Sequence, residues 1–373
     1  MSFGLWNWIA LDLRLSSSPL LADPKNYVPD EVDLNADPEA LKIWLSIMED
    51  SIKKVAEMAI SSQRFSMTAS ERASLFRKNF LAKIHLLREK PFAYGSANIR
   101  NLLDLREQIL NEHGFDDAYS LQKEMENSAA VRSYTNVIAN ISKIQDFEQK
   151  WILLSRGMLA GNVFDWGAEK VIQLMQRAGG LSFDEALQEI EERPWLHDGL
   201  DKFLSNLSNA NYKCAVIFVD NSGADFVLGI LPFARELASF GIKVIVVSNL
   251  YPALNDLTYT EMLGIVSSIR AIDPVVDKHI ENGQLLFTHH GQGSPCLDFR
   301  RIHSDLNELV IFEKVDLVII EGMGRSLHTN FSAKFTCDSL KVAVIKTQWL
   351  ADRLNGKLFS VVFKLDEGCV QED

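Results

Sequence analysis

The pattern that most constrains the fold lies after about residue 210, where short apolar runs rich in β-branched residues alternate with longer helical stretches. The runs are Cys214–Val219, Ile242–Val247, Val315–Ile320, Val342–Ile345 and Phe359–Phe363. Strands that are apolar on both faces and separated by helices are typical of a parallel sheet covered by helices. The sequence therefore predicts a Rossmann-like α/β domain in residues 206–373.

The chain before this domain has a different composition and is expected to be helical. Only three of the 20 glycines precede residue 150. Apolar residues recur at three- and four-residue steps from Glu39 to Ser62, and Thr68–Glu71 has a capping-box pattern that predicts a helix running towards Glu89. Residues 39–205 are therefore predicted to form a helical region. Four of the ten prolines lie within residues 1–38, which predicts an extended N-terminal arm.

Composition excludes several classes of partner. The chain has 38 Lys+Arg against 50 Asp+Glu, a formal charge of −12, whereas non-specific nucleic-acid binding needs an excess of basic side chains. No apolar run reaches the roughly 18 residues that would indicate a membrane span. The apolar start lacks the basic segment of a signal peptide. The four cysteines are far apart and contain no CxxC pair, which favours reduced thiols in a cytoplasmic protein.

Polar residues follow the predicted strands at the edge where an open parallel sheet binds ligands. Asp220 and Asn221 follow the first strand, and Asp256 follows the second after a short loop. Glu321-Gly322-Met323-Gly324-Arg325 ends a third strand, and Lys346 ends a fourth. Because the carboxyl ends of parallel strands share one edge, we expect these residues to lie together.

This set of residues suits metal-assisted hydrolysis of a phosphate ester. Asp220, Asn221 and Asp256 offer the oxygen ligands that Mg²⁺, Mn²⁺ and similar ions bind. Arg325 and Lys346 could hold a phosphate, with backbone N–H groups of Gly322 and Gly324 as further donors. A divalent ion would then stabilise charge on the phosphoryl oxygens. His328, three residues after Arg325, is a candidate substrate contact.

Simpler interpretations exist for each motif alone. Asp-Asn-Ser-Gly after a strand is common turn and N-cap chemistry, and Asn255-Asp256 before Thr258 is a plausible cap. Gly322-Met323-Gly324 fits a tight turn as well as a phosphate loop. His289 and His290 are neighbours on an extended chain and face opposite ways, so a shared metal is not expected. The chain lacks the P-loop and GxSxG motifs, which gives a nucleotide cofactor no support.

Taken together, the motifs resemble the metal-dependent damage-control phosphatase family. The resemblance covers roughly residues 30–370 and rests on Phe218–Asp225, Asn255–Thr258, Glu321–Arg325 and Gly161–Asp165. Within the family, the motifs are similar to the branch fused to the C-terminus of some eukaryotic pantothenate kinases, such as pantothenate kinase 4. We expect a stand-alone protein similar to plant members.

The resemblance implies a three-layer α/β/α fold with a mostly parallel sheet, preceded by a helical N-terminal region. It implies a divalent cation (Mg, Mn, Co or Ni) held by Asp220, Asn221 and Asp256. Asn162 and Asp165 match a Gly-Asn…Asp segment near the family's site and join Asp220 and Asp256 as predicted catalytic residues. The implied reaction is hydrolysis of a small phosphorylated metabolite, 4′-phosphopantetheine and its oxidised or damaged forms. Whether water on the metal or a carboxylate attacks is left open.

Two other classes remain as alternatives. An S-adenosylmethionine-dependent methyltransferase would need a glycine-rich loop after the first strand, where Asp220 stands. A metal-stabilised, non-catalytic binding module would leave the basic residues at the strand ends without a purpose. A haloacid-dehalogenase-type phosphatase is disfavoured because Ser222 occupies the place of its second aspartate.

Overall fold

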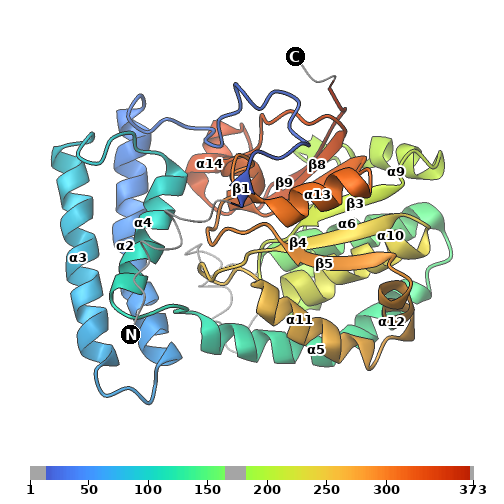
Figure 1. The fold of residues 1–373 in the computed structure, drawn as a ribbon, viewed down its shortest axis with the longest axis horizontal. Coiled ribbons are helices and arrows are strands. Elements are labelled where there is room, and N and C mark those ends of the chain that lie inside the picture. The colour runs from blue at the N-terminus through green and yellow to red at the C-terminus, as the bar shows by residue number, and fades with distance from the viewer. Residues whose placement is uncertain (1–13, 164–181, 370–373) are drawn as a thin grey trace.

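A seven-stranded sheet organises the C-terminal half of the chain (Figure 1). The computed structural model describes residues 14–163 and 182–369. A separate pair, β1 and β6, forms a two-stranded sheet. The strands are β1 (Leu15–Ser16), β2 (His197–Asp198), β3 (Cys214–Phe218), β4 (Lys243–Ser248), β5 (Leu285–His289), β6 (Ile302–His303), β7 (Leu317–Glu321), β8 (Asp338–Val344) and β9 (Val361–Asp366).

The strand order is β2-β9-β8-β7-β3-β4-β5. Strands β5, β4, β3, β7 and β8 are parallel, and β9 joins the sheet antiparallel to β8. The chain passes from β3 to β4 and β5 on one side, then returns to place β7 on the other side of β3. Strand order therefore reverses at β3. The predicted mostly parallel α/β fold is confirmed.

Twelve α-helices and two short π-helical segments accompany the strands in the described residues. The π-helical segments are η1 (Asp225–Ile230) and η2 (Met323–His328). The α-helices are α2 (Pro38–Ser62), α3 (Ala69–Glu89), α4 (Ile99–Glu112), α5 (Ser120–Ser142), α6 (Phe147–Val163), α8 (Phe183–Glu189), α9 (Leu200–Ser208), α10 (Leu231–Ser239), α11 (Tyr259–Arg270), α12 (Pro274–Glu281), α13 (Ser304–Phe312) and α14 (Gln348–Arg353).

Local sequence signals explain where several helices begin. The Asp37 side chain accepts a hydrogen bond from the Ala40 N–H, which caps α2 where the apolar stripe predicted a helix. Helix α3 begins at Ala69 as predicted, but the Thr68 side chain makes no capping bond.

Within the described residues, no helix is both long and apolar enough to cross a membrane.

The apolar core has two layers, one on each face of the sheet. In β3, Ala215 and Ile217 pack with α5, α6 and α10, whereas Val216 and Phe218 pack on the opposite side with α13. Successive side chains of a strand point to opposite faces, so an uninterrupted apolar strand must be covered on both. The sheet is therefore the middle of three layers, α/β/α.

Helices α2, α3 and α4 form a separate group, here called the helical cap, beside the strand ends (Figure 1). Their buried side chains make a core of their own, which also takes in Leu254 and Cys296 from the loops after β4 and β5. The later helices of the predicted helical region, α5 and α6, instead pack on the sheet. Strand β2 also precedes the predicted boundary at residue 206. The described part of the N-terminal arm, from residue 14, pairs with β6 through β1.

Candidate active site

The candidate site lies at the carboxyl ends of β3 and β7, where strand order reverses. Such a reversal opens a crevice, because the connections from the two neighbouring strands leave in opposite directions. Asp220 lies two residues beyond the end of β3, and Glu321 is the last residue of β7. The Asp220 N–H donates a hydrogen bond to the Glu321 carboxylate over 2.7 Å. The predicted convergence of strand-end residues is therefore present at this crevice.

Three buried carboxylates form the centre of the site. Oxygen atoms of Asp220, Asp225 and Glu321 lie within 4.8 Å of one another. Asp225 begins η1, a kind of helical distortion that is frequent at functional sites. Burial, followed by repulsion from Asp220, raises the pKa of Asp225 to about 7. Burial and the charges of Asp225 and Asp220 also raise the pKa of Glu321 well above its ordinary value.

A divalent cation fits this cluster. Among the described residues, Asp225 Oδ1 is buried and has no hydrogen-bond partner, so it is available as a ligand. Carboxylate oxygens are the ligands that hard divalent ions prefer, and a nearby cation would offset the repulsion between the buried charges. Asp225 and Glu321 are therefore candidate ligands in addition to the predicted Asp220, Asn221 and Asp256.

Two side-chain amides orient the carboxylates. Asn221 Nδ2 donates to Asp220 Oδ2 over 3.1 Å and to Asp225 Oδ2 over 2.8 Å. Asn162, near the end of α6, donates to Asp220 Oδ2 over 3.3 Å and to Glu321 Oε1. Both predicted asparagines therefore lie at the centre of the site. The predicted catalytic residue Asp165 lies outside the described residues.

Arg325 lies between two of the predicted metal ligands. Its Nη2 donates to Asp256 Oδ2 over 2.8 Å, and its Nη1 forms an ion pair with Asp220. The guanidinium is fully buried, and these carboxylates raise its pKa although burial alone would lower it. Arg325 was predicted from the sequence to contact the phosphate. In the structure it forms ion pairs with Asp220 and Asp256, because buried carboxylates need a positive partner.

Lys346 follows β8 and supplies a second buried positive charge at this edge of the sheet. Its charge lowers the pKa values of Asp225 and Glu321, although burial of those two groups has the larger, opposite effect. Arg325 and Lys346 thus face four buried carboxylates: Asp220, Asp225, Asp256 and Glu321.

The two predicted glycines act by allowing close packing. Gly322 has φ +104°, and a Cβ there would lie 2.3 Å from Asp220 Cγ. Its N–H, predicted as a donor to a phosphate, instead donates to the Val342 carbonyl. A Cβ on Gly324 would lie 2.1 Å from the Pro295 carbonyl oxygen. Any side chain at either position would therefore clash with Asp220 or with Pro295 and displace it.

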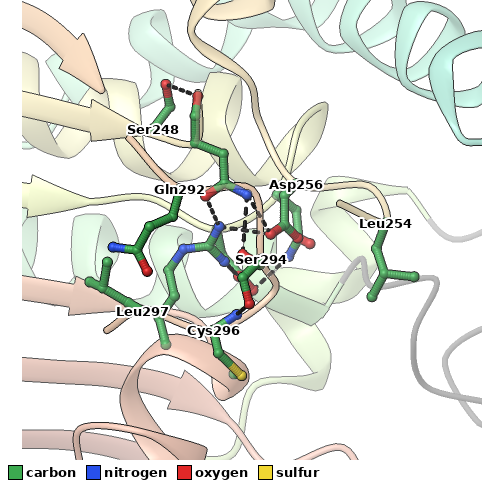
Figure 2. A network of polar contacts seen from close by, with 12 residues as sticks. Ser248, Leu254, Asp256, Gln292, Ser294, Cys296 and Leu297 are labelled. Carbon is green, nitrogen blue, oxygen red and sulfur yellow. Dashed lines mark hydrogen bonds and ion pairs between the residues drawn. The ribbon is translucent and has the colours of Figure 1, made fainter. Parts of the chain in front are cut away.

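A second network holds Asp256 in place. Asn249 Nδ2 donates to Asp256 Oδ2 over 3.1 Å and to the Ser294 carbonyl over 3.2 Å; Figure 2 shows Asp256 and Ser294 within this network. Asn249 Oδ1 accepts from Arg325 Nη2 over 2.9 Å and lies 2.8 Å from His290 Nε2. Burial and the charge of Arg325 lower the pKa of His290 well below its ordinary value. His290 is thus a neutral hydrogen-bonding partner.

A cavity of about 70 Å³ separates the strand ends from the helical cap. Asp220, Asn221 and Asp256 line one side, and Trp44 of α2 lines the other. The predicted substrate contact His328 also lines this cavity, with its ring 5.2 Å from that of Trp44. The cap therefore closes over the carboxylates and belongs to the site.

Comparison with known proteins identifies the family of the chain. The model of the damage-control phosphatase ARMT1-like domain matches residues 44–362. The chain belongs to this family. The family resemblance expected from the sequence motifs is therefore confirmed.

Relatives of this ARMT1-like chain include named phosphatases. It is 40% identical to mouse 4′-phosphopantetheine phosphatase over 98% of the chain and 50% of that protein. It is 36% identical to a damage-control phosphatase of Arabidopsis thaliana, with 92% of the chain and 90% of that protein covered. A rice protein named pantothenate kinase 2 is 37% identical over 93% of the chain and 41% of that protein. The chain thus spans half or less of the mouse and rice proteins.

A solved structure supports the fold. The crystal structure of a DUF89 family protein from Pyrococcus horikoshii has a TM-score of 0.59 and 16% sequence identity. The match covers 86% of the ARMT1-like chain and 96% of the archaeal chain. The overall fold is therefore one that a solved protein shares.

Proposed function

We propose that this chain is a divalent-metal-dependent phosphatase that hydrolyses 4′-phosphopantetheine and its oxidised or damaged forms. The observation that carries the proposal is the buried cluster of Asp220, Asp225 and Glu321 at the reversal of strand order. Four buried carboxylates face two buried basic side chains at this edge, so the charges balance when a divalent cation is added. Membership of a phosphatase family supports the same activity.

The cation would be held by Asp220, Asp225 and Glu321, with Asn221 and Asp256 beside them. A divalent ion there would stabilise negative charge on the phosphoryl oxygens and activate a water molecule. An all-oxygen set favours Mg²⁺ or Mn²⁺, and Co²⁺ or Ni²⁺ can occupy similar sites.

The side chains of the protein orient the carboxylates and exclude water from the cavity. Asn162 and Asn221 fix the carboxylates through paired amide donors, so few side-chain rotations must be frozen when substrate binds. Arg325 holds Asp220 and Asp256 at a constant separation. The cap side chains Trp44 and Met48 cover the cavity with apolar surface, which lowers the local dielectric and strengthens polar contacts to the phosphate.

The substrate assignment rests on the relatives and on the space available. The mouse relative is named 4′-phosphopantetheine phosphatase. A larger cavity of about 360 Å³ lies beside the carboxylate cavity. The loops after β4 and β5 line both, with Tyr251 and Ser294 in the larger cavity and Leu254 and Pro295 in the smaller. A substrate with a phosphate at the end of a long, flexible chain could extend through both cavities.

The setting we propose is the cytoplasm, with no nucleic-acid partner. Cys214, Cys296, Cys337 and Cys369 form no disulfide, as expected in a reducing compartment. The net charge of −12 opposes binding to a polyanion but does not prevent a local positive site for a small phosphate.

A phosphate-release assay tests the function. Full-length protein is treated with EDTA, then tested with 4′-phosphopantetheine and hexose phosphates, with and without added Mg²⁺, Mn²⁺, Co²⁺ or Ni²⁺. We expect no activity without metal, restored activity with it, and the highest kcat/KM for the phosphopantetheine substrates. Asp50→Asn, an exposed carboxylate of α2, is the control and should behave as wild type. Undiminished turnover in metal-free protein would refute the metal requirement, and a preference for hexose phosphates would refute the substrate.

A further inference from the structure

The basic side chains at the strand ends are already committed to carboxylates. Arg325 uses both Nη atoms on Asp220, Asp256 and Asn249. Its Nε is buried without a hydrogen-bond partner among the described residues, but Arg325 does not line the cavity of about 70 Å³. Lys346 is buried at the same edge of the sheet and is not without a partner there. A phosphate monoester brings up to two further negative charges. Its binding therefore calls for a positive group beyond those at the strand ends.

Arg106 of α4 has the properties of such a group. It is 2% exposed and lines the 70 Å³ cavity together with Asp220, Asn221 and Asp256. Its Nε donates to the Glu107 carboxylate over 3.1 Å. Its Nη2 is buried and has no hydrogen-bond partner among the described residues. A buried guanidinium N–H without a partner is costly, and a ligand in the cavity would satisfy it.

The same face of the cap carries a second unpartnered donor. Trp44 Nε1, on α2, is buried without a hydrogen-bond partner among the described residues and lines the same cavity. Buried Trp N–H groups usually find a partner. Two such donors, on two different helices, face the carboxylates across one cavity. This pairing indicates a polar ligand between the cap and the strand ends.

We propose that Arg106 binds the phosphoryl group of the substrate from the helical cap, an inference that rests on the proposed phosphatase function. The cavity holds several times the volume that one water molecule requires, which leaves room for a phosphoryl group. A guanidinium presents planar N–H donors that match phosphate oxygens.

Glu107 holds Arg106 and links it to the opposite wall. One Glu107 oxygen accepts from Arg106 Nε, and the other accepts from the Leu254 N–H over 3.5 Å. Leu254 precedes Asp256 by two residues in the same loop. The position of Arg106 is therefore tied to the loop that carries a carboxylate of the site.

The test compares phosphate binding with metal binding in the full chain. Calorimetry measures the Kd of inorganic phosphate for Mn²⁺-loaded protein and, separately, the Kd of Mn²⁺, for wild type, Arg106→Gln and Arg106→Lys. A charge-assisted hydrogen bond of ordinary strength predicts about a 10- to 100-fold weaker phosphate Kd for Arg106→Gln. The Lys variant should be intermediate, because an ammonium lacks the forked donors. Mn²⁺ affinity should stay within about threefold of wild type in both variants, because neither change removes a carboxylate from the metal site.

A matched control separates this role from general charge effects. Arg72 of α3 is in the same cap and donates to the His113 and Gly114 carbonyls at the end of α4. Arg72→Gln therefore removes the same charge outside the cavity and should leave the phosphate Kd unchanged. Equal loss in Arg72→Gln, or unchanged phosphate affinity in Arg106→Gln, would overturn the proposal.

Two further results have a defined meaning. If Arg106→Gln shows no cooperative urea transition, it is not folded, and the phosphate Kd of Arg106→Lys is used in its place. A phosphate Kd of Arg106→Lys equal to that of wild type would overturn the proposal. If wild type releases no phosphate from any ester with any metal, the phosphatase function fails. The calorimetric result with inorganic phosphate still tests Arg106 in that case.

Discussion

Replacing Gly322 with alanine is the smallest change that the structure predicts to disable the site. A Cβ at this position would lie 2.3 Å from Asp220 Cγ and 2.5 Å from Asp220 Oδ2. Heavy atoms essentially never approach a Cβ more closely than 3.0 Å, so Asp220 or the backbone must move by at least 3.0 − 2.3 = 0.7 Å. The backbone of Gly322, at φ +104° and ψ 146°, is also in a region that is almost exclusive to glycine.

Two costs add for Gly322→Ala. The backbone conformation costs about 1–3 kcal/mol for a residue with a Cβ. Overpacking against a rigid neighbour costs about 1–3 kcal/mol more. We therefore expect the free energy of unfolding to fall by about 2–6 kcal/mol. Displacing Asp220 by a good fraction of an ångström should also lower kcat/KM by about 100-fold.

Urea unfolding and phosphate-release kinetics measure the two effects. Gly264→Ala is the control, because Gly264 lies within α11, has no atom within 4 Å of its Cβ position and needs no positive φ. That variant should gain about 0.5–1 kcal/mol from helix propensity and keep wild-type turnover. The reasoning would be refuted if Gly322→Ala unfolded within about 0.5 kcal/mol of wild type and kept kcat/KM within about twofold, margins set by ordinary surface substitutions.

Two other substitutions follow from the charges at the strand ends. Asp225→Asn removes a charged oxygen and should weaken Mn²⁺ binding, measured by calorimetry, at least about tenfold. The free energy of unfolding without metal should stay the same or rise, because a repulsion between buried carboxylates is relieved. Unchanged Mn²⁺ affinity would exclude Asp225 as a ligand. Arg325→Met should lower the metal-free unfolding free energy by about 3–5 kcal/mol, because Asp220 and Asp256 lose their buried partner, and saturating Mn²⁺ should restore part of that loss. Equal stability of Arg325→Met and wild type without metal would contradict the assigned role.

The core strands were predictable because their sequence carries an unambiguous signal. β3, β4 and β7 lie largely on the predicted apolar, β-branched runs, whereas those runs cover only Val342–Val344 of β8 and Val361–Phe363 of β9. β5, at the sheet edge, was missed because its partly exposed residues Leu285–His289 include Thr288 and His289. β2 has only two residues, His197 and Asp198, which are too few to show an apolar strand pattern.

The site was predictable in outline for the same kind of reason. Asp220 and Asn221 follow β3 closely, and Asp256 and Arg325 lie in the segments after β4 and β7, so a shared edge was enough to place them together. Asp225 was not assigned a role, although its spacing of four residues from Asn221 is the available signal. No local pattern marked Arg106, which lies on an ordinary amphipathic helix.

By itself the sequence determined where the central apolar strands lie, which polar residues follow them, and that an acidic set with two basic partners would share one edge of a parallel sheet. These properties depend on residues close together in the chain. Only the tertiary structure decided that β7 returns beside β3, that Asp225 and Glu321 join Asp220, and that Arg325 neutralises carboxylates. It also decided that Arg106 faces them from the helical cap. Those outcomes depend on strand order and on charge balance in a buried space, which bring together residues as far apart in the chain as Asp220 and Glu321 or Asp220 and Arg325.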